Sequence, residues 1–332
     1  MENIDMKHVE KVWAGADTVD KISDKDGNVL WSRIGSRVDW AYYDFVKNTL
    51  YFFGEVNSEL EQKVAAGTAA KYNWKDTGYT DPPWSSDASL NCTDIVFDET
   101  ALRIKPKSCW AWFCDFEKCN NITNPQYLDT SQVYEMESMF DGFGASSEEP
   151  PTQIDLTDWD TGKVENMESI FSAFYRHCPK PPKLLINTWN VSRVRNLNGA
   201  FEGCAMAAEP VASLDLSGWR TDACLDMSDM FHGYGNQAHE GACVLDLHNI
   251  STVNVDSFSG MWSYFAQGAS SARVRWASTP EATIHEDAFD HSKFVDANYD
   301  FRIYVPDTYY DLYANKWPKI ANVGHLAKQS QW

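Results

Sequence analysis

Seven aromatic residues recur along the chain at steps of 27 to 31 residues, and this period constrains the fold more than any other feature. Each serves as the anchor of one repeat unit: Phe113, Phe140, Phe171, Phe201, Phe231, Trp262 and Phe289. Mostly apolar columns accompany the anchors twelve, four and one residues before them and three residues after them. One such unit cannot bury its own apolar face, so the units are expected to stack and share a continuous core.

The columns predict which side chains form that core. The predicted set is Trp159, Trp189, Trp219, Met136, Met167, Met227, Phe140, Phe171, Phe201, Phe231 and Trp262. Tryptophan faces can also form a sugar-stacking ladder. Their fixed place between two apolar columns favours packing instead, and the methionines suit the filling of irregular gaps in a core.

Each unit is expected to contain a short strand and a short helix. The triplets at 154–156, 214–216 and 245–247 alternate apolar, polar and apolar residues, as a strand with one buried face does. The anchor and the columns four and one residues before it fall at i, i+3 and i+4, which predicts one face of a helix. The unit is therefore predicted to run from strand through a tryptophan corner and a short helix to a loop.

These residues resemble a known repeat family. IDLTDWDTGKVENMESIF at 154–171 and LDLSGWRTDACLDMSDMF at 214–231 are similar to the units of BspA-like leucine-rich-repeat surface proteins and of the related Mycoplasma-type lipoprotein repeat, LDLSxWDTSxVxxMxxMFxxC. The resemblance implies an α/β solenoid, a right-handed, leucine-rich-repeat-like stack of short parallel strands and short helices. Members of the family mostly bind other molecules, and it offers no catalytic residues to carry over.

The period also divides the chain into regions. About seven repeat coils of roughly 30 residues occupy residues 101–290. Residues 36–100 are predicted to form an N-terminal cap with the first strand, and residues 291–332 a C-terminal capping strand and helix. Caps are expected because an open end of a solenoid is an unpaired strand edge.

Residues 1–35 are predicted to form a separate small β-hairpin module. Asp24, Asp26 and Asn28 imitate the start of a calcium loop, but Gly35 stands where the twelfth-position glutamate would be, which favours a hairpin turn. VEKVWAGADTVDKISDKDGNVLWSR at 9–33 resembles N-terminal modules of tail and head-fibre proteins from phages of Gram-positive bacteria. The resemblance implies attachment to other virion subunits through residues 1–35.

Composition excludes several classes of partner. The net charge of −20 argues against nucleic acid, which requires clustered lysine and arginine. No apolar run reaches the roughly 20 residues of a membrane span, and the first residues do not read as a signal peptide. The eight cysteines lack metal-site spacing and are interpreted as reduced, buried thiols. We therefore predict no cofactor and no metal.

Binding is expected in the loops after the anchors, because loops on a rigid scaffold commonly carry function. The candidate contacts are Glu148, Glu149, Tyr175, His177, His232 and His239. The acidic residues Asp155, Asp158, Asp160 and Glu165 could host a glycosidase carboxylate pair, but they recur as polar repeat positions and are interpreted as a solvated face.

The sequence thus leads to three functional hypotheses. The first is a non-enzymatic phage virion protein, a fibre, appendage or decoration subunit assembled in the host cytoplasm, which binds a bacterial surface glycan or protein. The second is a BspA-like adhesin at the bacterial cell surface, and the third is a cell-wall glycosidase. Oligomeric state stays open, a homo-oligomer included, because neither heptads nor a collagen-like run are present.

Overall fold

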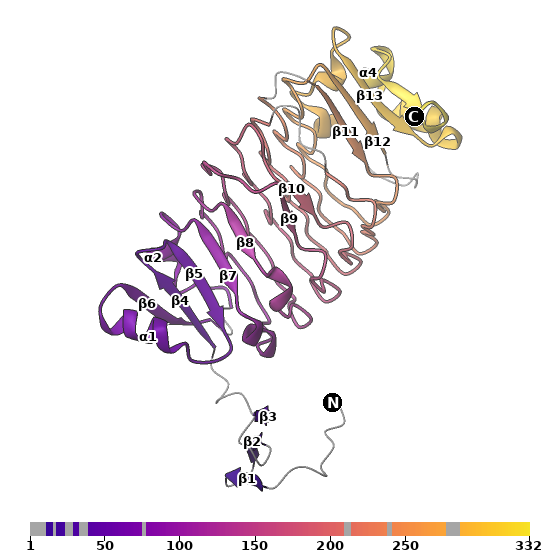
Figure 1. The fold of residues 1–332 in the computed structure, drawn as a ribbon. Coiled ribbons are helices and arrows are strands. Elements are labelled where there is room, and N and C mark those ends of the chain that lie inside the picture. The colour runs from indigo at the N-terminus through magenta and orange to yellow at the C-terminus, as the bar shows by residue number, and fades with distance from the viewer. Residues whose placement is uncertain are drawn as a thin grey trace.

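The computed structural model describes residues 11–15, 18–23, 29–32, 39–74, 78–208, 214–237, 241–276 and 286–332. From β4 to α4 the elements follow one another along a single elongated body (Figure 1). The calcium-loop imitation at residues 24–28 and the candidate contact His239 lie outside the described residues.

Three strands near the N-terminus form a sheet of their own. β1 (Lys11–Gly15), β2 (Thr18–Ser23) and β3 (Val29–Ser32) pair antiparallel in the order β1-β2-β3. All three strands fall within the region for which we predicted a β module.

A five-stranded sheet begins the elongated body, in the order β6-β4-β5-β7-β8. Its strands are β4 (Trp40–Asp44), β5 (Thr49–Phe53), β6 (Ala69–Asn73), β7 (Asp94–Phe97) and β8 (Asn121–Thr123). β4 pairs antiparallel with β5 and β6, whereas β5, β7 and β8 are parallel. The sheet therefore converts an antiparallel N-terminal region into the parallel pairing that the repeat units use.

Helix α1 (Ser58–Ala65) packs against β4 and β5 of this sheet. Its N-cap is Asn57, whose side chain accepts a hydrogen bond from the N–H of Leu60. Leu60 packs with Tyr42 and Phe53 in a small second core. A single turn of helix, α2 (Ser85–Ala88), follows before β7.

Parallel strands recur farther along the chain. β9 (Gln153–Asp155) pairs with β10 (Lys183–Leu185), and a second sheet has the order β11-β12-β13-β14. The latter strands are β11 (Ala242–Asp246), β12 (Ser271–Arg275), β13 (Asp300–Val305) and β14 (Leu326–Lys328). The helices α3 (Tyr310–Lys316) and α4 (Pro318–Asn322) lie between the last two strands.

Short 3₁₀ helices connect several of these elements. They span Glu99–Arg103, Pro125–Tyr127, Glu286–Phe289, Lys293–Val295, Asp307–Tyr309 and Gln329–Gln331. The triplet at 214–216, predicted as a strand, has no strand assignment.

At the seventh anchor a short 3₁₀ helix spans Glu286–Phe289, but the short helix predicted at each of the first six anchors is wrong. These segments, from four residues before each anchor to five after it, are runs of consecutive turns, and we call them the turn ladder: residues 109–118, 136–145, 167–176, 197–206, 227–236 and 258–267. Alternate N–H groups donate to the next unit, as from Phe140 to Ile170 (3.0 Å) and from Gly142 to Ser172 (2.8 Å). An α-helix would use those donors within its own segment.

Backbone conformation explains why turns replace the helix. The residue two positions after each anchor, the second post-anchor position, has a positive φ in seven consecutive units: Asp115, Gly142, Ala173, Gly203, Gly233, Tyr264 and His291. Apolar residues at i, i+3 and i+4 face one side in this arrangement too, because bonds such as that from the Met139 N–H to the Met136 carbonyl close i-to-i+3 turns.

Parallel bridges keep the units in register along this face. Single bridges join, in order, Ser108, Glu135, Asn166, Asn196, Asp226 and Ser257. Each of these residues lies five positions before its anchor, so equivalent residues of successive units stand side by side.

The interior contains two long aromatic stacks. Phe140, Phe171, Phe201 and Phe231 stack with ring centroids 5.4, 5.7 and 5.6 Å apart. The tryptophans at 159, 189 and 219 form a second stack at 6.1 and 6.4 Å. The predicted core side chains, named above, are all at most 4% exposed. They belong to one cluster that runs from β4 to β14.

Candidate functional site

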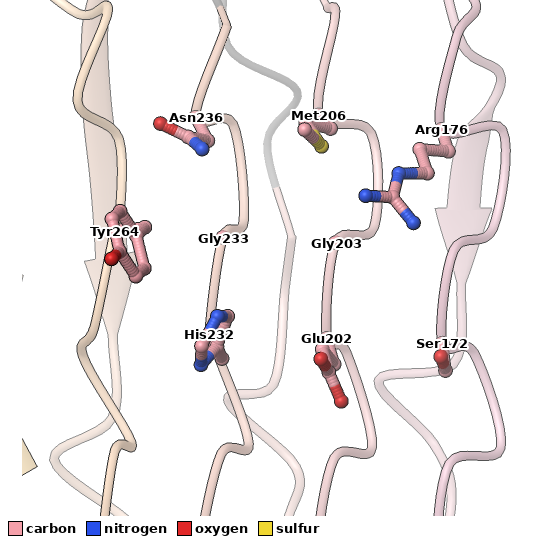
Figure 2. Close-up of a pocket in the computed structure, with 9 residues that line it drawn as sticks. All are labelled: Ser172, Arg176, Glu202, Gly203, Met206, His232, Gly233, Asn236 and Tyr264. Atoms are coloured by element: carbon pink, nitrogen blue, oxygen red, sulfur yellow. The ribbon is translucent and has the colours of Figure 1, made fainter.

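A pocket of about 310 Å³ opens on the turn ladder of the third to sixth units (Figure 2). Its lining comes from four consecutive units and consists of Ser172, Arg176, Glu202, Gly203, Met206, His232, Gly233, Asn236 and Tyr264. We call it the four-unit pocket. No single unit supplies more than three of these residues, so the pocket exists only when the units stack.

Two glycines form the floor of the four-unit pocket. Gly203 and Gly233 occupy second post-anchor positions with φ of 59° and 65°, a conformation that glycine adopts without steric cost. Ala173 and Tyr264 hold the equivalent positions on either side with φ of 51° and 57°. The pocket is therefore a gap of two missing side chains between Ala173 and Tyr264 in this column.

The floor is rigid, and its amides are already used. The N–H of Gly203 donates to the carbonyl of His232 (2.7 Å), and the N–H of Gly233 donates to the carbonyl of Ser263 (2.8 Å). These two N–H groups are therefore not available to a ligand in the pocket.

Two rows of side chains flank the floor, as Figure 2 shows. The row one position after the anchors contains Ser172, Glu202 and His232, and the row five positions after them contains Arg176, Met206 and Asn236. Polar side chains thus flank the floor on both sides, with the thioether of Met206 as the apolar member. Oε2 of Glu202 lies nearer to Gly199 than to the floor, 3.4 Å from where a Cβ on Gly199 would be.

An aromatic ring closes one end of the four-unit pocket. Tyr264 stacks on His291 with centroids 5.2 Å apart and an interplanar angle of 12°. On its other side it meets His232 at 5.4 Å and 45°. Because His291 continues the second post-anchor column beyond Tyr264, this aromatic column stops where the two glycines begin.

The electrostatic character of the site is mixed. The Nδ1 atom of His232 lies 3.1 Å from Oδ1 of Asp229, so a carboxylate stands beside this edge of the pocket. Asp141 is the next residue along the row that contains Ser172 and Glu202. Burial raises the pKa of Asp141, and the charges of Asp115 and Glu202 raise it further. A hydrogen bond from Ser172 opposes this shift. Negative charge along this row therefore disfavours a strongly anionic ligand.

The binding residues predicted from the sequence do not lie together in one site. His232 lines the four-unit pocket, whereas Glu148, Glu149 and His177 are exposed in loops outside it. The prediction for Tyr175 is wrong, because its side chain is fully buried. Its hydroxyl donates to the backbone carbonyl of Asn120 at 3.0 Å and lies 3.3 Å from that of Cys119.

Sequence reasoning missed most of the pocket. Arg176, Glu202, Asn236 and Tyr264 were assigned to no site, although the change from glycine to tyrosine two positions after successive anchors marks where the gap ends. This change indicates a gap only when the positive φ of these positions is already known.

The acidic residues considered for glycoside cleavage include turn-forming groups. Asp155 accepts hydrogen bonds from the N–H and hydroxyl of Thr157 (3.0 and 2.6 Å), and Asp160 accepts one from the N–H of Gly162 (2.9 Å). Such local bonds are typical of Asx turns at strand ends.

All eight cysteines are free, and all but Cys114 are buried. Within the described ranges, no group of three or more His, Cys, Asp or Glu side chains is placed to hold a metal ion. In the same part of the chain, no helix is long and apolar enough to cross a membrane.

The parallel bridges, the aromatic stacks and the four-unit pocket together define a repeat protein with a surface pocket built across its units. Residues 113–177, 144–273 and 172–299 each match the family described as "Mycoplasma protein of unknown function, DUF285". The matches together span residues 113–299, more than half of the chain, and the chain belongs to this family, which is related to the BspA-like repeats. No curated protein and no solved structure gives a significant match.

Proposed function

We propose that the chain is a non-enzymatic phage virion protein, a fibre, appendage or decoration subunit, whose repeat region contacts the bacterial host surface. The observation that carries the binding role is the four-unit pocket, which presents polar side chains and one aromatic ring on a backbone fixed by hydrogen bonds between units. Rigid scaffolds with variable surface residues are typical of binding proteins rather than of proteins that close over a substrate.

In this proposal the repeat region is a right-handed, leucine-rich-repeat-like solenoid. Support comes from the parallel bridges that join equivalent residues of successive units and from the aromatic stacks at 5.4 to 5.7 Å. Stacked units of this kind create long surfaces on which neighbouring loops act together.

The proposed site of attachment to other virion subunits is the region of residues 1–35. Support comes from its resemblance to phage fibre modules and from β1, β2 and β3, which form a sheet separate from that of the elongated body.

A second candidate is an adhesin at the bacterial cell surface. The family description, which names Mycoplasma proteins, favours it because it points to a cellular rather than a viral source. The two candidates share the binding role and differ in where the scaffold is mounted.

Immunogold electron microscopy with an antibody against the chain separates the candidates. The sample is the bacterial strain that carries the gene, before and after phage induction, together with purified particles. Gold on particles is the expected result. Gold confined to the envelope of uninduced cells would overturn the virion proposal and favour the adhesin.

The binding role has its own test. Fluorescently labelled full-length chain should decorate intact host cells, and washed host cell walls incubated with it should release no reducing sugar. Failure to bind any host cell would overturn the binding role, and sugar release would overturn the non-enzymatic proposal.

A further inference from the structure

We propose that the four-unit pocket binds a neutral, hydroxyl-rich saccharide ring. This proposal rests on the proposed function, because it names the chemical class that the host-binding surface recognises. The argument combines the shape of the gap, the polar groups at its edges and the charge around it.

The gap has the shape of a missing ring in a stack. His291 and Tyr264 stack at 5.2 Å, and the next two positions in their column are Gly233 and Gly203, which carry no side chain. A Cβ added at Gly233 would meet only the backbone of Gly203, at 3.8 Å, so the space above the floor is open. A ring laid over Gly233 would approach Tyr264 on the side where Tyr264 also meets the tilted ring of His232, so the ligand would contact both aromatic rings.

The space suits a small ligand. Successive units stand about 4.8 Å apart, as neighbouring strands do, so two glycine positions leave about 10 Å along the column. The volume of about 310 Å³ lies at the lower end of the range for small-molecule sites. One or two sugar rings match this space better than a folded protein surface does.

Polar groups meet the gap at both edges. Among the described residues, the side chains of Arg176, Glu202 and Asn236 make no hydrogen bond within the chain, so their donors and acceptors are available to a ligand. The guanidinium of Arg176 lies over the floor, 3.8 Å from where a Cβ on Gly203 would be.

A saccharide can form hydrogen bonds with all of these polar groups and can also pack on the aromatic ring. A carboxylate accepts from two hydroxyls, an amide both donates and accepts, and a guanidinium donates in a fixed fork. The C–H face of the same sugar ring packs on an aromatic side chain, whose π face carries partial negative charge. Tyr264 supplies that face at the end of the pocket.

Charge favours a neutral ligand over a polyanion, although Arg176 supplies one cation at the pocket. Glu202 lies in the pocket wall, Asp229 lies beside His232, and the whole chain has a net charge of −20. A phosphate-rich polymer would be repelled at long range and would leave Glu202 facing like charge. The ligand is therefore a neutral sugar rather than a phosphate-bearing polyol.

The test is saturation-transfer-difference NMR with the full-length chain. The probes are glucose, galactose, mannose, rhamnose, N-acetylglucosamine and their common disaccharides, with glycerol phosphate and adenosine as comparison probes. At least one neutral sugar should give a signal, and its dissociation constant should lie in the range of about 0.1 to 10 mM that one stacked ring and a few hydrogen bonds provide.

Variants locate the signal. Tyr264→Ala should weaken binding of the positive sugar about tenfold or more, and Glu202→Gln several-fold, since each removes about one contact. Gly233→Ala places a methyl group on the floor, in a column that accepts alanine at Ala173, and should also weaken binding. Tyr134→Ala is the matched control, because Tyr134 is 41% exposed against 37% for Tyr264 and lies outside the pocket; it should bind as the wild type does.

Three results would overturn the saccharide proposal: no signal from any neutral sugar, equal binding by wild type and Tyr264→Ala, or a stronger response to glycerol phosphate or adenosine than to every sugar. Cell binding separates these failures from failure of the proposed function. If wild type and Tyr264→Ala decorate host cells equally, the host-binding role stands and the pocket proposal falls. If the wild type binds sugar but no host cell, the pocket proposal stands and the host-binding role falls.

Discussion

The indole N–H of Trp189 donates a hydrogen bond to the backbone carbonyl of Leu156, 2.9 Å away in the preceding unit. The next tryptophan in the column, Trp219, does the same to Ile186 at 3.1 Å. Each of these tryptophans is fully buried, and each accepting residue is at most 1% exposed. Tryptophan therefore satisfies a buried carbonyl of the neighbouring unit in addition to filling the core.

We expect Trp189→Phe to lower the free energy of unfolding by about 0.5 to 1.5 kcal/mol, because the carbonyl of Leu156 loses this donor and keeps the backbone N–H of Trp159 at 3.2 Å. Trp189→Ala should cost about 3 to 5 kcal/mol, since it also creates a cavity. Urea denaturation followed by far-ultraviolet circular dichroism measures both. Trp332→Phe is the control, because Trp332 is 44% exposed, and it should change stability by less than about 0.5 kcal/mol. Equal stability of Trp189→Phe and wild type would show that this bond contributes nothing.

Two glycines of the turn ladder should respond differently to alanine. A Cβ at Gly144 would lie 2.5 Å from the ring of Tyr175, whereas one at Gly233 meets backbone only at 3.8 Å. Both residues have positive φ, so each substitution carries about 1 to 2 kcal/mol of backbone strain. Gly144→Ala should cost about 1 to 3 kcal/mol more, because the buried ring must move.

Thermal unfolding of the two variants side by side checks this prediction. The shared positive φ makes Gly233→Ala the matched control for Gly144→Ala. Equal losses of stability would mean that the ring of Tyr175 yields freely, and the packing argument would then fail.

The core could be predicted from the sequence, whereas the conformation around it could not. The columns at Met136, Met167 and Met227 repeat at fixed offsets, and burial follows from apolar periodicity whatever the backbone does. The helix prediction failed because i, i+3 and i+4 spacing fits consecutive turns equally well. Ser138 and Asp229 have φ of 54° and 53°, and neither residue type marks a left-handed conformation reliably.

The candidate site was less accessible to sequence reasoning. The four-unit pocket consists of two absent side chains between neighbours that lie about 30 residues apart, and a gap leaves no motif. Position after an anchor was enough to select His232. The same reasoning selected Tyr175, whose hydroxyl instead bonds to carbonyls that follow the first anchor, two units earlier.

Stability should depend on pH through a buried carboxylate in β4. Asp44 is fully buried, and its Oδ2 lies 2.7 Å from Nζ of Lys63. Desolvation acts to raise the pKa of Asp44, but the bonds from Lys63 and from two backbone N–H groups hold it below its ordinary value. A folded pKa below the unfolded one contributes stability at neutral pH, and that stability is lost as pH falls from about 4 through the folded pKa.

We therefore expect Asp44→Asn to be less stable than wild type by about 1 to 2 kcal/mol at neutral pH, because asparagine keeps an acceptor for the backbone N–H groups but loses the ion pair with a partly exposed lysine. The difference should narrow below about pH 4. Glu59→Gln is the control, since Glu59 also contacts Lys63 but its side chain is 75% exposed. A constant difference across this pH range would contradict the assignment.

The thiols should be unreactive in the folded chain. Burial raises the pKa of Cys204 and of Cys224 to about 12, and the pKa of the half-buried Cys114 also rises to about 12, chiefly by burial with a contribution from Asp115. The thiolate is the nucleophile, and at about pH 8 these groups are almost wholly protonated. Iodoacetamide followed by intact mass spectrometry should thus give almost no adduct on the native chain.

In concentrated urea without reductant, all eight cysteines should be labelled, since all are free. Fast native labelling would show that the units open, and fewer than eight adducts in urea would reveal a disulfide.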